Sequence, residues 1–278
     1  MIRRKRGIFS VINARTTCLL SLFLFCGGVS YAQALMGARL SGLAGAVTAM
    51  PDDSWQVFGN PAMVPVDKTT FSVYTRRNYN LAELTDYAGT FTWNHDNLTV
   101  GGGANSFGNN LYRQTRFLVV GMRRFKFVRV GLRVTYTRIS LAPPYGSAGQ
   151  FGIDAGFGIR ALPRLWIGAF ATNINSPKLG KALEPLPQTL DIGLSWMPAS
   201  KVFITTGIQK DIRFPVSVRS GIEWHPVSVF ALRVGVTTKP TTYAIGSGIS
   251  IGRLSANIVA QHHPWLGWSP GIDIGLNL

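Results

Sequence analysis

Charged side chains are scarce in this sequence. Asp, Glu, Lys and Arg make up 14% of its 278 residues, whereas soluble globular proteins average about 25%. Long apolar runs are also missing after residue 30, because no stretch there reaches the roughly 18–20 residues that a membrane-spanning helix needs. Together these absences disfavour both a soluble globular protein and a helical membrane protein, and they are typical of a membrane β-barrel.

Cysteine is confined to the first residues of the chain. Cys18 and Cys26 are the two cysteines, so the rest of the chain has no disulfide framework and no thiol metal site. His262 and His263 are adjacent and would point to opposite faces of a strand, which disfavours a metal site there. No serine, histidine and acid have the spacing of a hydrolase constellation, so we expect no enzymatic activity and no cofactor.

The N-terminus has the features of a secretion signal. Basic residues at 3–6 precede an apolar core over 18–29, and Ala32-Gln33-Ala34 forms an A-x-A cleavage site. Cleavage after Ala32 is an alternative, and a bulky residue before Cys26 disfavours a lipoprotein. We predict a cleaved signal peptide over 1–34, which exports the protein to the bacterial outer membrane.

A segment rich in small residues follows the signal. Residues 38–64 read ARLSGLAGAVTAMPDDSWQVFGNPAMV, which is too short and too broken to span a membrane and suggests a plug. We therefore predict an N-terminal hatch over 35–68. Its acidic pair, Asp52-Asp53, is either a gate that pairs with lumen arginines or a cap for backbone N–H groups. Asn60, Pro61 and Ala62 are expected to turn the chain and position the hatch.

From residue 69 to 278 the sequence alternates as strands do. In 128–136, Val, Leu and Tyr share one face, and Arg, Gly and Thr share the other. A soluble sandwich would place Lys, Glu and Thr on its polar face, whereas a wall that approaches a plug needs glycine there. We predict an all-β fold, a 14-stranded antiparallel transmembrane β-barrel. The expected strands are 69–77, 84–94, 98–105, 112–123, 127–139, 150–160, 165–173, 188–197, 201–210, 215–224, 229–237, 242–251, 254–261 and 270–278.

Ionised and aromatic residues occupy defined places in this pattern. Charges of both signs on the inward face predict a lumen closed by ion pairs, because buried charges need partners; a polar pore lining is the alternative. These charges are Arg129, Arg133, Asp154, Asp191, Arg219, Glu223, Arg233 and Asp273. Tryptophans near strand ends predict two aromatic girdles at the membrane interfaces. They are Trp93, Trp166, Trp196, Trp224, Trp265 and Trp268.

The net charge indicates which partners the chain has. It is formally +16, and five of the basic residues lie in the predicted signal. The others lie mostly at strand ends and in loops, where anionic lipid headgroups would meet them. We expect outer-membrane lipids and lipopolysaccharide as partners. Nucleic acid is not expected, because the chain has no basic helix or stacking platform.

The stretch from Gly42 to Ala62 resembles the N-terminal motif of the long-chain fatty acid porin superfamily. It has a Gly/Ala-rich lead, an acidic pair and Asn-Pro-Ala. Weaker similarities over 172–198, 220–238 and 262–276 point to the PorV/PorQ-type branch. The resemblance implies a fourteen-stranded outer-membrane barrel with a hatch. It further implies either a plugged conduit for small hydrophobic solutes, or a structural or type IX secretion accessory that binds protein partners.

Overall fold

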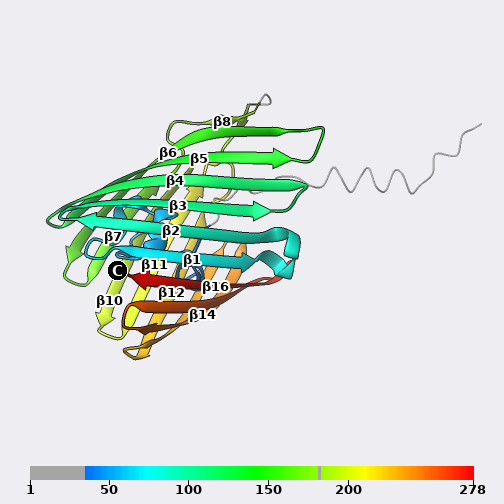
Figure 1. Cartoon of the computed structure of the whole chain (residues 1–278). Helices are drawn as coiled ribbons and strands as arrows, with labels where there is room; N and C mark the ends of the chain where they lie inside the picture. The colour runs from blue at the N-terminus through cyan, green and yellow to red at the C-terminus, as the bar shows by residue number, and fades with distance from the viewer. Residues whose placement is uncertain (1–34, 181–182) are drawn as a thin grey trace, which may run out of the picture. The chain divides into compact units, whose positions relative to one another are not determined.

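The computed structural model describes residues 35–180 and 183–278, so the predicted signal peptide lies outside the described residues. Fourteen antiparallel strands form one closed barrel, in which β1 pairs with both β2 and β16 (Figure 1). The prediction of fourteen strands is confirmed, and each predicted segment coincides with one strand. The barrel strands are β1 (Thr70–Arg77), β2 (Thr85–His95), β3 (Leu98–Gly108), β4 (Tyr112–Phe125), β5 (Val128–Leu141), β6 (Ser147–Leu162), β7 (Leu165–Ala171), β10 (Thr189–Ala199), β11 (Val202–Asp211), β12 (Ser217–Val227), β13 (Phe230–Thr238), β14 (Thr241–Ile251), β15 (Leu254–His263) and β16 (Gly267–Asn277).

The outer face of the barrel is apolar because side chains alternate along each strand. In β5, Val130, Leu132 and Val134 are exposed, while Arg129 and Arg133, which alternate with them, are buried. The other barrel strands also place apolar side chains outward. An exposed apolar face around a closed barrel suits lipid rather than water, as in transmembrane barrels.

The two ends of the barrel differ in their connections. We call the end with the β2–β3, β4–β5, β6–β7, β10–β11, β12–β13 and β14–β15 connections the turn end, and the opposite end the loop end. At the loop end, the connection between β7 and β10 contains the short pair β8 (Lys178–Leu179) and β9 (Glu184–Pro185). Two short helices, η3 (Asn78–Asn80) and η4 (Ala82–Leu84), join β1 to β2.

Residues 35–69, which we call the lumen segment, lie against the inner face of the wall. The segment contains α2 (Ala38–Gly42), η1 (Ser54–Val57) and η2 (Pro61–Met63). The α2 helix contacts β13 to β16, η1 contacts β1 to β4, and η2 contacts β4 to β6. Apolar side chains of the segment and of the wall form one buried cluster, so the core lies inside the barrel. Among the described residues, no helix is both long and apolar enough to cross a membrane.

One predicted girdle tryptophan lies on the wrong face. Trp93, Trp196, Trp224, Trp265 and Trp268 are all exposed, but Trp166 is only 7% exposed and belongs to a buried cluster with Ala49 and Met63. The prediction for Trp166 is therefore wrong. Its partner across the β7–β10 ladder is the buried Ser195, so its ring points into the lumen.

Candidate functional site: the closed lumen

Wall glycines let the backbone of the lumen segment approach the barrel closely. A Cβ atom on Gly168 would lie 2.8 Å from the Cα of Ala49, and one on Gly235 would lie 2.6 Å from the backbone N of Ala44. Contacts this short cannot exist between real atoms, so only glycine fits at these positions. The small inward residues therefore decide the path of the segment.

Asp52 is tied to the wall by an ion pair. Its Oδ1 lies 2.9 Å from Nη1 of Arg129, a residue of β5 whose side chain is 5% exposed. The guanidinium of Arg129 also lies over the ring of Trp166, 4.5 Å from its centroid. Asp52 has a φ of 64°, a left-handed conformation that Asp and Asn tolerate better than most residues. The pattern predicted a pair between the acidic residues and lumen arginines, and Asp52 forms one.

Asp53 caps backbone N–H groups, one of the two alternatives that the sequence left open, and pairs with an arginine of the lumen segment itself. Its Oδ1 accepts a hydrogen bond from the backbone N of Trp55 at 2.9 Å, which caps η1. Its Oδ2 lies 3.1 Å from Nη1 of Arg39. The two aspartates thus hold different parts of the segment, Asp52 outward to the wall and Asp53 inward to α2.

Arg39 connects the segment to the opposite side of the barrel. Its Nε and Nη2 donate to the two carboxylate oxygens of Glu223 at 2.8 and 2.7 Å. Glu223 is 1% exposed and also pairs with Arg233 at 2.5 Å. Burial favours the neutral form of Arg39, but the carboxylates of Glu223 and Asp53 outweigh it and raise its pKa. The guanidinium therefore stays charged, and the Arg39–Glu223 fork persists over the physiological pH range.

Asn60 is a polar junction between the segment and the wall. Its side-chain oxygen accepts from the backbone N of Ala62 at 3.0 Å, and Pro61 follows as the first residue of η2. Its amide nitrogen donates to the carbonyl oxygens of Thr48 at 2.7 Å and of Phe157 in β6 at 3.1 Å. The Asn-Pro-Ala motif thus both turns the chain and fastens the turn to the wall.

Gln56 links separate parts of the segment. Its side chain is fully buried and donates to the carbonyl oxygens of Val47 at 2.8 Å and Met50 at 2.7 Å. Its side-chain oxygen accepts from the backbone N of Asn60 at 3.0 Å. Because the segment has little regular structure, this one amide replaces the backbone ladder that a helix would supply.

Arg133 and Asp154 connect the segment to the loop end. Nε of Arg133 lies 2.6 Å from Oδ2 of Asp154, and both side chains are almost fully buried. Nη1 of Arg133 donates to the carbonyl oxygens of Val57 and Gly59 at 3.1 and 2.9 Å. Oδ1 of Asp154 accepts from the backbone N of Asn173, in the connection after β7, at 2.6 Å.

The remaining predicted lumen charges, Asp191, Arg219 and Asp273, lie inward and form no direct ion pair within residues 35–180 and 183–278. Asp273 accepts from the backbone N of Ala38 at 2.6 Å and from the amide of Asn257 at 2.7 Å. Asp191 and Arg219 are bridged by Gln209, which donates to Asp191 at 3.1 Å and accepts from Arg219. Ion pairs and amide bridges together link the charged groups on the inner face of the wall.

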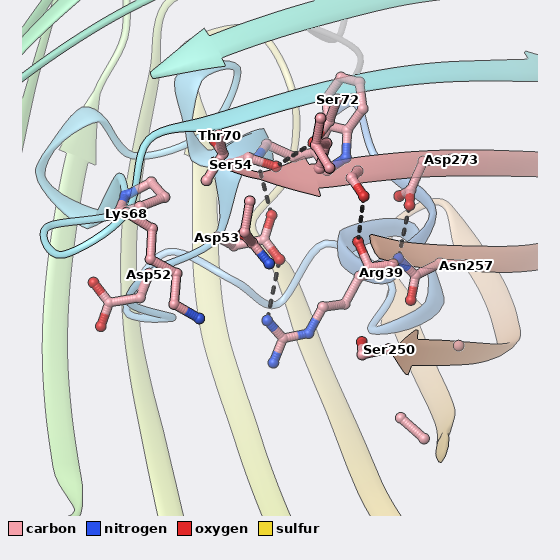
Figure 2. A pocket seen from close by; sticks show the side chains of 18 of the residues that line it. Arg39, Asp52, Asp53, Ser54, Lys68, Thr70, Ser72, Ser250, Asn257 and Asp273 are labelled. Carbon is pink, nitrogen blue, oxygen red and sulfur yellow. Dashed lines mark hydrogen bonds and ion pairs between the residues drawn. The ribbon is translucent and has the colours of Figure 1, made fainter. Parts of the chain in front are cut away.

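A cavity of about 450 Å³, lined by both polar and apolar residues, lies at the turn end between the segment and strands β1 and β13 to β16. Figure 2 shows Arg39, Asp53, Asn257 and Asp273 around this cavity. Among the described residues, no group of three or more His, Cys, Asp or Glu is placed to hold a metal ion. These contacts hold the lumen segment against the inner face of the wall.

Sequence reasoning missed Arg39 and Gln56. Both lie within residues 38–64, where the acidic pair is the more conspicuous feature. A usable signal existed for Arg39, because it is the one basic residue between positions 35 and 67. A lone positive charge in a segment destined for a lumen needs a buried acid as its partner.

No protein-family model matches the sequence, and no curated protein does. Solved structures with the same architecture do match. The toluene transporter TodX of Pseudomonas putida is 11% identical with a TM-score of 0.70, and the match covers 88% of this chain and 99% of that one. The toluene transporter TbuX of Ralstonia pickettii is 12% identical with a TM-score of 0.64, covering 89% and 100%. A FadL homologue of Pseudomonas aeruginosa is 10% identical with a TM-score of 0.55, covering 87% and 97%. These similarities show a shared barrel fold.

Proposed function

We propose that this protein is an outer-membrane barrel of the fatty acid porin superfamily and serves as a conduit for small hydrophobic solutes. The lumen segment is its hatch, and the structure represents the closed state. The observation that carries the proposal is a closed fourteen-strand barrel with a filled lumen, similar over most of its length to two toluene transporters. Small aromatic hydrocarbons are accordingly the first solutes to test.

The interior offers such a solute an apolar environment. Trp55 and Phe58 of the lumen segment pack with Leu118 and Val120 of β4 in the buried cluster. A hydrophobic solute that enters this cluster would have to displace these packed side chains, and its own apolar contacts would offset part of that cost. The surrounding ion pairs hold the segment in place while no solute is bound.

Uptake by cells tests the conduit. The protein would be expressed in a Gram-negative host that lacks its own barrel for hydrophobic solutes, and initial uptake of radiolabelled toluene would be measured. We expect uptake severalfold above that of cells carrying the empty vector. The same host expressing an unrelated barrel at an equal level is the control. Uptake equal to the control would overturn the conduit.

A second candidate is a non-transport barrel, either structural or an accessory of type IX secretion. The many bonds of the lumen segment favour it, because Arg133, Thr237 and Thr99 fasten the segment to three separate parts of the wall. A gate that must move needs fewer hydrogen bonds to the wall. Crosslinking in the native membrane followed by co-purification of secretion components, with no effect of the protein on toluene uptake, would favour this candidate.

A further inference from the structure

The outer face of the barrel strands carries basic but no acidic side chains, whereas the inner face carries both signs. The acidic ones are all buried and face the lumen: Asp86, Asp154, Asp191, Asp211, Glu223 and Asp273. The exposed Lys and Arg side chains on the outer face of the same strands are Arg77, Arg113, Arg123, Arg138 and Lys210. The barrel therefore presents only positive charge to its surroundings from its strands.

Two of these basic residues are neighbours at the loop end. Arg113 of β4 lies opposite Ser140, and Arg138 of β5 lies opposite Thr115, so the two arginines are diagonal neighbours on one face. Nη2 of Arg138 donates to the hydroxyl of Ser147 at 3.1 Å, and Nη2 of Arg113 donates to Asn110 at 3.2 Å. Neither arginine has an ion-pair partner among the salt bridges of the described residues.

Aromatic rings lie directly beneath the pair. The rings of Tyr136 and Phe151 are 4.9 Å apart, and Phe117 on β4 is 55% exposed. Gly149 lies opposite Arg138, and any side chain there would collide with the ring of Tyr136. Glycine at this position therefore lets the Tyr136 ring lie along the wall, with its hydroxyl directed toward the level of Arg138.

On this outer surface, the hydrogen-bond donors lie nearer the loop end and the aromatic rings lie nearer the middle of the barrel. We propose that Arg113, Arg138, Ser147 and Tyr136 form a binding site for the phosphate groups of lipid A, the membrane anchor of lipopolysaccharide. Guanidinium groups bind phosphate through paired hydrogen bonds, and aromatic rings mark the boundary of the apolar band. Lipid A carries phosphates above acyl chains, and it occupies the leaflet that the loop end meets if that end faces outward.

Direct binding tests the site. Native mass spectrometry would measure how purified protein binds lipid A with two phosphates, lipid A with one phosphate and phosphatidylglycerol. The test variant is Arg113→Ala with Arg138→Ala. The matched control is Arg77→Ala with Lys210→Ala, which removes two exposed but separate positive charges. All of these positions are exposed, and a heat-shift gel would verify that each variant is a folded barrel.

We expect the test variant to bind lipid A with two phosphates about tenfold more weakly or worse, because each lost arginine removes charged hydrogen bonds. The control should change by less than about twofold, since exposed isolated charges contribute little. If the test and control variants lose the same lipid A affinity, the effect comes from net charge alone and the proposed site is wrong. Equal binding of phosphatidylglycerol, lost equally on mutation, would overturn the assignment to lipid A.

Discussion

Asp52 pairs with Arg129 across the boundary between the lumen segment and the wall, at 2.9 Å. The two side chains differ in burial, since that of Asp52 is 48% exposed and that of Arg129 is 5% exposed. Partial exposure of the carboxylate weakens the pair through solvent screening. We therefore expect this contact, which we call the latch, to open at a lower free-energy cost than the buried pairs deeper in the lumen.

The first prediction concerns this latch. Asp52→Asn preserves the left-handed backbone, which Asn tolerates, and removes only the charge. We expect it to lower the free energy of unfolding by about 1 kcal/mol and to raise the frequency of conductance events in planar bilayers. Asp67→Asn is the control, because it removes an exposed pair with Arg124 at the turn end. Identical conductance traces for the two variants would contradict a gating role for Asp52.

The second prediction concerns the buried fork between Arg39 and Glu223. Glu223→Gln removes the carboxylate that pairs with Arg233 and leaves Arg39 with Asp53 as its remaining acidic partner. Removal of one partner from a buried pair typically costs about 3–5 kcal/mol. Thermal unfolding of the purified barrel should show a larger loss of stability for Glu223→Gln than for Asp52→Asn. Adding Arg39→Met to Glu223→Gln should cost less than the sum of the single changes, because the pair acts as a unit. Strict additivity would show that the fork does not hold the segment.

Most of the barrel could be predicted from the sequence because every strand meets the same two environments. Lipid outside and the lumen inside impose a period of two, which the residues of β5 and β6 follow without interruption over their central parts. Trp166 shows where this reasoning fails. The ladder between β6 and β7 shifts register between Arg160 and Leu162, so closeness to a turn does not decide which face Trp166 occupies.

The lumen segment could be located but its contacts could not be derived. Its path is irregular, so no period relates position to direction, and its partners come from far along the chain. Arg39 and Glu223 are 184 residues apart. Pairing of the acidic residues with a lumen arginine could be anticipated from charge alone, because several arginines face the lumen. The sequence does not show which aspartate pairs with the wall. It also does not show that Gln56 links separate parts of the segment, and both contacts are evident only in the structure.

A third prediction fixes the orientation of the barrel. The longer connections lie at the loop end, which we expect to face the cell exterior. Single cysteines at Pro144 and Lys178 should react with an impermeant thiol reagent on intact cells, and cysteines at Pro163 and Ser200 should not. The chain has no cysteine after Cys26 to interfere. Labelling of the second pair alone would mean that the turn end is outside.

The last prediction tests whether the lumen segment is wedged against the wall. A Cβ on Gly168 would lie 2.8 Å from the Cα of Ala49 and 2.9 Å from the carbonyl carbon of Thr48, so Gly168→Ala must displace the segment or bend β7. Gly121→Ala is the matched control, since a Cβ there, on the outer face of β4, meets nothing within 4 Å.

Overpacking of this kind typically costs about 1–3 kcal/mol, and we expect Gly168→Ala to lose stability in that range while Gly121→Ala stays near the parent. Both variants should retain the β signal in circular dichroism, because neither change removes a ladder hydrogen bond. Gly168→Ala should also raise the conductance of the barrel in planar bilayers, because the displaced segment no longer seals the lumen. If its stability and conductance match those of Gly121→Ala, the segment shifts freely past Gly168 and is not held by close packing.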